Sequence, residues 1–246
     1  MKTESNTVLI TGGASGIGLA LAEKFLQAGN TVIVCGRREG KLAEAKARLP
    51  RLHTRVCDVA DPKEREALRA WAIREFPALN VVVNNAGIQQ RIALREPPAW
   101  EKLREELAIN LDAPIHLAAL FIPHLLTQKD PAIVNVTSGL AFSPLANTPV
   151  YSATKAALRS FTLSLRHQLT GTPISVVEII PPAVDTDLGG VGLHTFGAPL
   201  GVFMDSVWEQ LKSGSQETTY GFSAESSRAG REQLDAIFKR MNPVQA

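Results

Sequence analysis

The chain contains few cysteines, has a small net charge and lacks long hydrophobic runs. Its cysteines, Cys35 and Cys57, both end strand-like apolar runs, and we expect two buried reduced thiols because disulfides are rare in the cytosol. The 26 basic and 24 acidic residues are interspersed and leave a formal charge of +2, without the basic stripe that binds nucleic acid. The longest apolar run, residues 117–126, is broken by Pro123 and His124 and is too short to span a bilayer.

The first residues, Met-Lys-Thr-Glu-Ser-Asn-Thr, lack the apolar core of a signal peptide. Together these absences predict a soluble cytoplasmic protein without a membrane or nucleic-acid partner. A metal site is not expected either, because the histidines show no HExxH or comparable ligand spacing. They are His53, His116, His124, His167 and His194.

Apolar runs rich in β-branched residues alternate with segments of helical periodicity. The chain shows no repeat, low-complexity tract or linker that would divide its 246 residues into two domains. We therefore predict an α/β fold over residues 1–246: a single-domain, Rossmann-type, doubly wound parallel sheet with helices on both faces. The runs that predict its strands are residues 7–11, 31–35, 52–57, 79–83, 133–137 and 174–180.

The pattern changes beyond residue 186. Residues 188–201 are rich in glycine with scattered apolar side chains, and we predict a mobile substrate-covering segment at about residues 187–215. A short helix at 202–211, a last strand at 217–221 and a terminal helix at 231–240 are expected.

A glycine loop, Thr11-Gly-Gly-Ala-Ser-Gly-Ile-Gly18, joins the first strand to a helix that stops at Gly29. Glycines let the backbone approach a pyrophosphate, and the N-terminus of the helix faces it with unpaired N–H groups. The spacing Gly12-x3-Gly16-x-Gly18 differs from the common G-x-G-x-x-G. A glycine loop alone is also compatible with an ordinary turn, but its place between strand and helix favours nucleotide binding.

The second strand is followed by Gly36-Arg37-Arg38, near the position where many NAD-binding folds carry an acid. A carboxylate there would repel the 2′-phosphate of NADP, whereas a guanidinium binds it. The pattern therefore favours NADP over NAD. Glu39, an acid one position farther on, argues against NADP, but we expect it to cap or solvate the next helix.

Tyr151 and Lys155 are four residues apart and lie on one face of a predicted helix over residues 148–170. A lysine ammonium within about 5 Å favours the phenolate and, with about 4 kcal/mol of differential interaction, would lower the tyrosine pKa by about three units. The pair would then serve as a general acid and base. On spacing alone the same pair occurs on many surface helices.

Two further polar residues stand out. Ser138 follows the fifth strand, at the edge where open parallel sheets bind ligands. Asn110 lies among apolar residues in a helical stretch over residues 100–128, which we expect to bend near Pro114. A buried Asn needs partners, so a structural role for it remains as open as a functional one.

Taken in order, these motifs resemble the classical short-chain dehydrogenase/reductase family, in the form of an NADP-preferring bacterial member. They are the glycine loop, Asn84-Asn85-Ala86-Gly87, Asn110, Ser138 and Tyr151-x3-Lys155, and the match extends over roughly residues 5–186. Details such as Pro181-Pro-Ala-Val-Asp-Thr are similar to a bacterial subgroup labelled after D-alanine transfer to lipoteichoic acid, a label that specifies no substrate.

The resemblance implies roles for the catalytic residues. Tyr151 would be the proton donor in carbonyl reduction and the base in alcohol oxidation. Ser138 would orient the substrate oxygen, Lys155 would lower the tyrosine pKa and hold the nicotinamide ribose, and Asn110 would keep a water in the proton relay. The implied cofactor contacts are Gly12, Ser15, Gly16, Ile17, Gly18, Arg37, Arg38, Asp58, Val59, Asn85, Ala86, Gly87, Tyr151, Lys155, Pro181, Val184 and Thr186. The expected substrate wall is Gln89, Leu140, Phe142, Leu145, Leu188, His194 and Phe196.

The chain departs from the family pattern in two places. Pro182-Ala183 stands where the family has Pro-Gly, so the turn must accommodate a Cβ. The usual carboxyl-terminal ending is absent, and residues 217–222 are expected to replace its strand. Since that ending often helps to build tetramers, we expect a homodimer through the Asn110 and Tyr151 helices instead.

The leading hypothesis is an NADPH-dependent carbonyl reductase, reversible as an alcohol dehydrogenase, acting on a ketone, aldehyde or secondary alcohol. The apolar wall favours a hydrophobic substrate. The alternative is a non-catalytic protein that binds or senses NADP(H) on the same fold. A serine hydrolase is disfavoured, because Val136-Thr-Ser-Gly-Leu140 lacks the G-x-S-x-G elbow.

Overall fold

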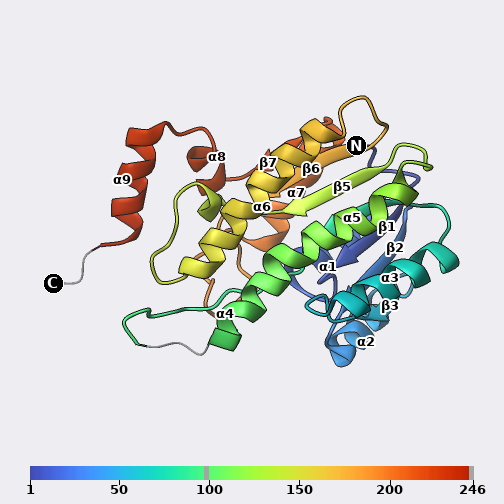
Figure 1. Ribbon diagram of the computed structural model, residues 1–246, viewed down its shortest axis with the longest axis horizontal. Coiled ribbons are helices and arrows are strands. Elements are labelled where there is room, and N and C mark those ends of the chain that lie inside the picture. Colours follow the sequence, from blue (N-terminus) through green and yellow to red (C-terminus); the bar gives the residue numbers. More distant parts are fainter. Residues whose placement is uncertain (97–99, 244–246) are drawn as a thin grey trace.

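Seven parallel strands form the centre of the structure, a computed structural model that describes residues 1–96 and 100–243 (Figure 1). They pair in the order β3-β2-β1-β4-β5-β6-β7, so the direction of winding reverses between β1 and β4. Ligands of such sheets bind outside the carboxyl ends of the strands at this reversal. The strands are β1 (Thr7–Thr11), β2 (Thr31–Gly36), β3 (His53–Val56), β4 (Leu79–Asn84), β5 (Ala132–Val136), β6 (Ser175–Ile180) and β7 (Glu217–Thr219).

Helices cover both faces of the sheet and enclose two separate hydrophobic cores. Because successive side chains of a strand point to opposite faces, Val8 and Ile10 belong to one core and Leu9 to the other. The first core is closed by α1 (Gly16–Gln27), α2 (Glu39–Arg48) and α7 (Leu200–Lys212). The second is closed by α3 (Pro62–Glu75), α5 (Ala113–Leu125) and α6 (Pro149–Gln168). The predicted doubly wound sheet is confirmed.

The predicted helix over residues 100–128 is interrupted. It consists of α4 (Trp100–Leu107), a π-helical turn η1 (Ala108–Asp112) and α5. Pro114 explains the interruption, because it has no N–H to donate to the carbonyl of Asn110 four residues earlier, and its ring crowds that carbonyl. The Asn110 carbonyl is thus left without its α-helical donor, at the position where the sequence predicts a bend.

The same helical stretch, Trp100–Leu125, is long and apolar enough to cross a membrane by length and composition alone. In this fold its α5 part packs against α3 and β4, with Leu117, Phe121 and Leu125 buried. An apolar face of this kind is what a core helix requires. The stretch is therefore a core helix of the domain.

Beyond β6 the chain differs from the prediction of a covering segment over residues 187–215. Phe203, Met204 and Val207 of α7 are buried in the first core, and α7 packs against α1. Of the predicted covering segment, only residues 187–199 lie outside this helix, and they form consecutive turns. The short strand β7 pairs in parallel with β6, as predicted from the unusual ending.

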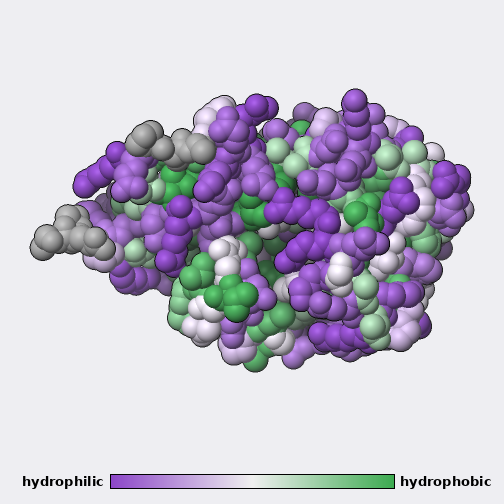
Figure 2. All heavy atoms as spheres, turned by 90° about the horizontal axis from the view of Figure 1, so that it is seen from below, coloured by the Kyte–Doolittle hydropathy of each residue, from purple (hydrophilic) through white to green (hydrophobic). Residues whose placement is uncertain are grey.

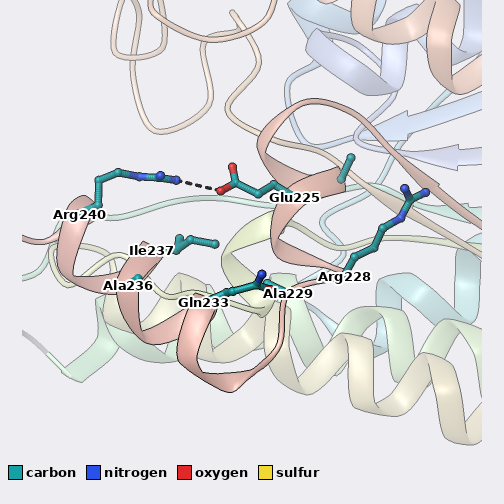
Figure 3. A pocket seen from close by; sticks show the side chains of 8 residues that line it. Glu225, Arg228, Ala229, Gln233, Ala236, Ile237 and Arg240 are labelled. Carbon is teal, nitrogen blue, oxygen red and sulfur yellow. Dashed lines mark hydrogen bonds and ion pairs between the residues drawn. The ribbon is translucent and has the colours of Figure 1, made fainter.

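Of the carboxyl-terminal helices, α8 (Phe222–Ser226) packs on the turn after β5, whereas α9 (Arg231–Met241) lies at one end of the molecule (Figure 1). Between them lies an open groove of about 650 Å³, crossed by an ion pair of Arg240 with Glu225 at 3.3 Å (Figure 3). None of the predicted site residues lines this groove. Its lining is Ala224, Glu225, Arg228, Ala229, Gln233, Ala236, Ile237 and Arg240.

Candidate active site

The predicted site residues gather at one edge of the sheet. The strands are parallel, so the residues that follow β1, β2, β4, β5 and β6 all lie at the carboxyl edge. On the face seen in Figure 2, the surface is hollowed near its centre, with hydrophobic and hydrophilic residues along its border. Among residues 1–96 and 100–243 there is no group of three or more His, Cys, Asp or Glu side chains that could hold a metal ion.

The glycine loop packs tightly against the segment after β4. A Cβ on Gly12 would lie 2.8 Å from Ala86 Cα, and one on Gly18 would lie 2.4 Å from Asn85 Nδ2. The Thr11 hydroxyl accepts the backbone N–H groups of Asn85 and Ala86, each at 3.0 Å, while Asn85 Nδ2 donates to the Thr11 carbonyl at 2.9 Å. The Asn85 side chain thus braces the loop, a role that was not predicted.

This loop fits a dinucleotide. Gly12 and Gly16 have φ of 63° and 53°, the left-handed region that favours glycine. Ser15 stands at the N-cap of α1, and its side chain makes no capping hydrogen bond. The first N–H groups of α1 therefore keep their capacity to bind an anion such as a pyrophosphate.

The segment after β6 lies beside the loop. Thr186 is 3.6 Å from the position of a Cβ on Gly16, and the Pro181 carbonyl accepts the N–H of Gly139 at 2.8 Å. Ala183, which replaces the family glycine, does not have a positive φ, so its Cβ strains no backbone. Val184 is buried and forms a bridge with Ala198, which ties residues 187–199 to the site.

Two arginines flank the carboxyl end of β2. Arg37 forms an ion pair with Glu105 of α4 at 2.7 Å, and Arg38 donates to the Ser15 hydroxyl of the glycine loop at 3.1 Å. The ion pair is half exposed and is worth at most about 1 kcal/mol, so Arg37 can exchange Glu105 for a phosphate. Glu39 lies in the first turn of α2, consistent with its expected place at the helix end.

Asp58 and Val59, two of the predicted cofactor contacts, lie after β3. Asp58 Oδ1 accepts the N–H of Ala60 at 3.0 Å, and the N–H of Asp58 donates to Glu64 Oε2 at 2.6 Å. Val59 is buried against the second core. These bonds fix the backbone at the end of the sheet next to Arg37.

The predicted catalytic residues come together and are all buried. Lys155 Nζ lies 5.6 Å from the centre of the Tyr151 ring and donates to the Val136 carbonyl at 2.8 Å. The Ser138 hydroxyl accepts the N–H of Leu140 at 3.1 Å, in the short turn Gly139–Ala141. Tyr151 lies in the first turn of α6, which begins at Pro149.

The pKa of Tyr151 differs from the prediction. Burial raises it to about 12, the hydrogen bond with Ser138 opposes this rise, and the charge of Glu106 adds to it. The prediction of a lowered Tyr151 pKa is therefore wrong, because burial is the largest influence and raises it. Burial also lowers the pKa of Lys155 to about 8, a change that the charge of Glu106 opposes. At neutral pH Tyr151 is a protonated phenol beside a charged lysine.

Asn110 uses its side chain to hold the backbone after Gly87. Its Oδ1 accepts the N–H of Ile88 at 2.9 Å, and its Nδ2 donates to the Ile88 carbonyl at 2.8 Å and to the Thr154 hydroxyl at 3.2 Å. The side chain is occupied by these contacts, and whether Asn110 keeps a water in a proton relay stays a prediction.

Two residues of the site were missed by reasoning from the sequence. Glu106 of α4 is fully buried and close enough to Tyr151 and Lys155 to shift the pKa of both. The signal was its position four residues before Asn110, on the same helical face. Phe222 of α8 lies against Gly139, where a Cβ would be 2.9 Å from its ring, and nothing in the sequence indicated this contact.

The predicted substrate wall is only partly assembled. Residues 187–199 touch Gln89, whose carbonyl is 3.0 Å from the position of a Cβ on Gly189. Phe142 lies under the guanidinium of Arg159 at 4.4 Å. Phe196 is 77% exposed, with the His194 ring 5.9 Å from its own, so this end of the wall faces solvent. Leu140, Leu145 and Leu188 are partly buried near the same edge.

The chain is similar to known dehydrogenases and oxidoreductases. A family model described as short chain dehydrogenase matches residues 6–191. The chain is 51% identical to an uncharacterized oxidoreductase, DltE, of Bacillus subtilis over 98% of both chains, and 30% identical to the 1-deoxy-11-beta-hydroxypentalenate dehydrogenase of Streptomyces exfoliatus over 98% of this chain and 92% of that one. A solved serine dehydrogenase in complex with NADP+ has a TM-score of 0.77 and 27% identity, over 87% of this chain and 94% of that one.

Replacing Gly18 by Ala should impair cofactor binding. The new Cβ would overlap Asn85 Nδ2 at 2.4 Å and the Gly12 carbonyl at 2.6 Å, so the loop must move away from the pyrophosphate site. We expect at least a tenfold rise in the Kd for the reduced nicotinamide cofactor, about 1.4 kcal/mol, measured by fluorescence titration. Gly40→Ala is the control, because no atom lies within 4 Å of its Cβ position. Unchanged affinity in Gly18→Ala would contradict the tight packing of the loop.

Proposed function

The chain belongs to the short-chain dehydrogenase family of oxidoreductases, which act on CH–OH and C=O groups with a nicotinamide cofactor, and we propose that it is an NADPH-dependent carbonyl reductase that also runs in reverse as an alcohol dehydrogenase. One observation carries the proposal: a buried, protonated Tyr151 lies between Ser138 and Lys155 at the carboxyl edge, beside a glycine loop built for a dinucleotide. The family membership supports this assignment of roles.

The nicotinamide, when bound, supplies the hydride. As charge develops on the carbonyl oxygen, Tyr151 donates its phenolic proton to that oxygen, and the Ser138 hydroxyl orients it by a hydrogen bond. A tyrosine pKa of about 12 keeps the phenol protonated until it meets so strong a base as an alkoxide. Lys155 then stabilises the tyrosinate by its charge.

NADP(H) is the proposed cofactor. Arg37 and Arg38 directly follow β2, and their side chains reach Glu105 of α4 and Ser15 of the glycine loop, respectively. A guanidinium binds a 2′-phosphate bidentately. Arg38 already reaches the glycine loop through Ser15, so a phosphate there would meet a positioned donor. The serine dehydrogenase described above was solved with NADP+, which supports the same choice here.

The substrate is a small molecule, and we place it between Tyr151 and residues 187–199. The exposed side chains there include Val191 and Phe196, at 86% and 77% exposure. An apolar ligand would remove this surface from water, which stabilises the complex. A hydrophobic ketone, aldehyde or secondary alcohol therefore fits the site, with residues 187–199 closing over it.

Tyr151→Phe should abolish turnover while it preserves the cofactor site. The substitution removes the proton and leaves a ring of the same shape, so we expect the rate of NADPH oxidation with a panel of ketones and aldehydes to fall by a factor of 100 or more. The Kd for NADPH should change less than threefold. If the unmodified protein binds NADPH yet turns over none of these compounds, the alternative of a cofactor-sensing protein is favoured.

Arg37→Asp combined with Arg38→Ala should reverse the cofactor preference. The changes remove the positive charges that would meet the 2′-phosphate and place a carboxylate near it, so NADPH should lose at least tenfold more affinity than NADH. The measurement is kcat/KM with each cofactor. Arg48→Asp, which alters an exposed ion pair with Glu23 on another surface, is the matched control. An equal loss of kcat/KM for both cofactors would show that these arginines do not bind the 2′-phosphate.

We also propose that the protein is a cytoplasmic homodimer formed through the helices that carry Asn110 and Tyr151. Ile115 of α5 and Leu163 of α6 are exposed hydrophobic side chains on these helices, at 37% and 42% exposure. Light scattering should give the mass of two chains, and Ile115→Glu with Leu163→Glu should give one. A tetramer, or a dimer that both substitutions leave intact, would contradict this interface.

A further inference from the structure

Glu106 is a carboxyl group buried inside the site. It lies on α4, one turn before Asn110, and its exposed fraction is 0%. Its Oε1 accepts the backbone N–H of Gln90 at 3.1 Å. Within the part of the chain that the structure describes, its Oε2 has no hydrogen-bond partner. A buried carboxylate with a free oxygen is costly, and natural proteins keep few such groups.

Glu106 lies on a helix that packs against the helix of two predicted catalytic residues. Helix α4 packs against α6, the helix that carries Tyr151 and Lys155. Lys155 Nζ and Asn110 Oδ1 lie 3.7 and 3.4 Å from the position of a Cβ on Gly87, three residues before the Gln90 whose N–H Glu106 accepts. The Lys155 ammonium has three N–H donors, and Val136 accepts one of them.

A buried lysine cation also needs compensation. Lys155 is 4% exposed, and a buried charge without a partner is unstable unless an opposite charge lies near it. The direct contact of Lys155 with the Val136 carbonyl supplies a dipole but no charge. The charge of Glu106 favours the protonated form of Lys155 without a direct ion pair, and the Glu106 carboxylate is held in place by the N–H of Gln90.

We propose that Glu106 is a positioning residue for the reaction: as the buried counter-charge of Lys155, it keeps the lysine protonated and so supports proton delivery by Tyr151. The inference rests on the proposed function of Tyr151 and Lys155. It adds to that site a carboxyl group on a different helix, which also fixes the backbone of Gln90, next to the substrate-covering segment.

The electrostatics agree with this geometry. Burial raises the pKa of Glu106 to about 7, while the Gln90 N–H and the charge of Lys155 oppose the rise. Burial lowers the pKa of Lys155 to about 8, and the charge of Glu106 opposes this. The titratable groups that face Glu106 from α6 are Lys155 and Tyr151. Glu106 therefore ionises just below the pH range in which Lys155 would lose its proton.

The sign of the pH effect follows. Above pH 7 Glu106 is negative and holds the proton on Lys155, so removing this charge lets Lys155 lose its proton at lower pH. Below about pH 6 Glu106 is itself neutral, and removing its charge changes little. The contribution of Glu106 to catalysis is thus present at alkaline pH and absent at acid pH.

Glu106→Gln isolates the charge, because a glutamine Oε1 can still accept the N–H of Gln90. We expect kcat for carbonyl reduction to match that of the parent at pH 6 and to fall about tenfold at pH 8.5, with the alkaline limb of the profile moved down by about one pH unit, the size of shift that one nearby charge produces. The KM for NADPH should change less than twofold. Glu106→Asp keeps a carboxylate and should restore most of the alkaline activity.

Glu101→Gln is the matched control, since it removes one acid from the exposed first turn of the same helix and should leave the profile unchanged. If kcat of Glu106→Gln equals that of the parent at every pH, or is lower by the same factor at every pH, the inference is overturned and Glu106 is a structural residue.

A second readout does not depend on turnover. Nuclear magnetic resonance of ¹³C-labelled lysines should show the pKa of Lys155 about one unit lower in Glu106→Gln than in the parent, assigned with Lys155→Arg. An unchanged lysine pKa would overturn the inference even if the protein has no measurable activity. The proposed function fails by a different result, a Tyr151→Phe variant that keeps full turnover.

Discussion

The site depends on holding a lysine cation next to a tyrosine inside the protein. Lys155 is 4% exposed and Tyr151 6%, and at this depth burial dominates the ionisation of both groups. The phenol therefore stays protonated at neutral pH, and in the proposed reaction the cation stabilises the tyrosinate after the proton has left. The Val136 carbonyl holds Lys155, and a hydrogen bond with Ser138 acts on Tyr151. In the proposed function the glycine loop binds the cofactor and residues 187–199 cover the substrate.

The sheet makes this arrangement possible because it brings distant segments to one edge. The brace between Thr11 and Asn85 joins the glycine loop to β4, and Asn110 joins the backbone of Ile88 to the helix of Tyr151. The π-helical turn contains Asn110, and Pro114 lacks the N–H that an α-helix would donate to the Asn110 carbonyl. These contacts couple the cofactor edge of the fold to the catalytic helix.

Much of this could be predicted from the sequence because it depends on local patterns. The apolar run Thr7–Thr11 and the Tyr151–Lys155 spacing predict a strand and a shared helical face, and both are present. Quantities set by tertiary burial could not be predicted: the direction of the Tyr151 pKa was wrong because solvent exclusion is invisible in a spacing. Glu106 was missed because an acid beside Glu105 in a polar helix resembles a solvated face; its spacing from Asn110 was the one signal, and the packing of α4 on α6 shows that it is buried.

The proposed chemistry requires that a bound nicotinamide meets the Tyr151 hydroxyl while its ribose meets Lys155. The most direct test is a crystal structure of the complex with NADP(H). We expect the nicotinamide ring to face the Tyr151 hydroxyl, with Lys155 on the ribose and the 2′-phosphate beside Arg37 or Arg38. A nicotinamide ring bound away from Tyr151, with Lys155 turned from the ribose, would contradict it.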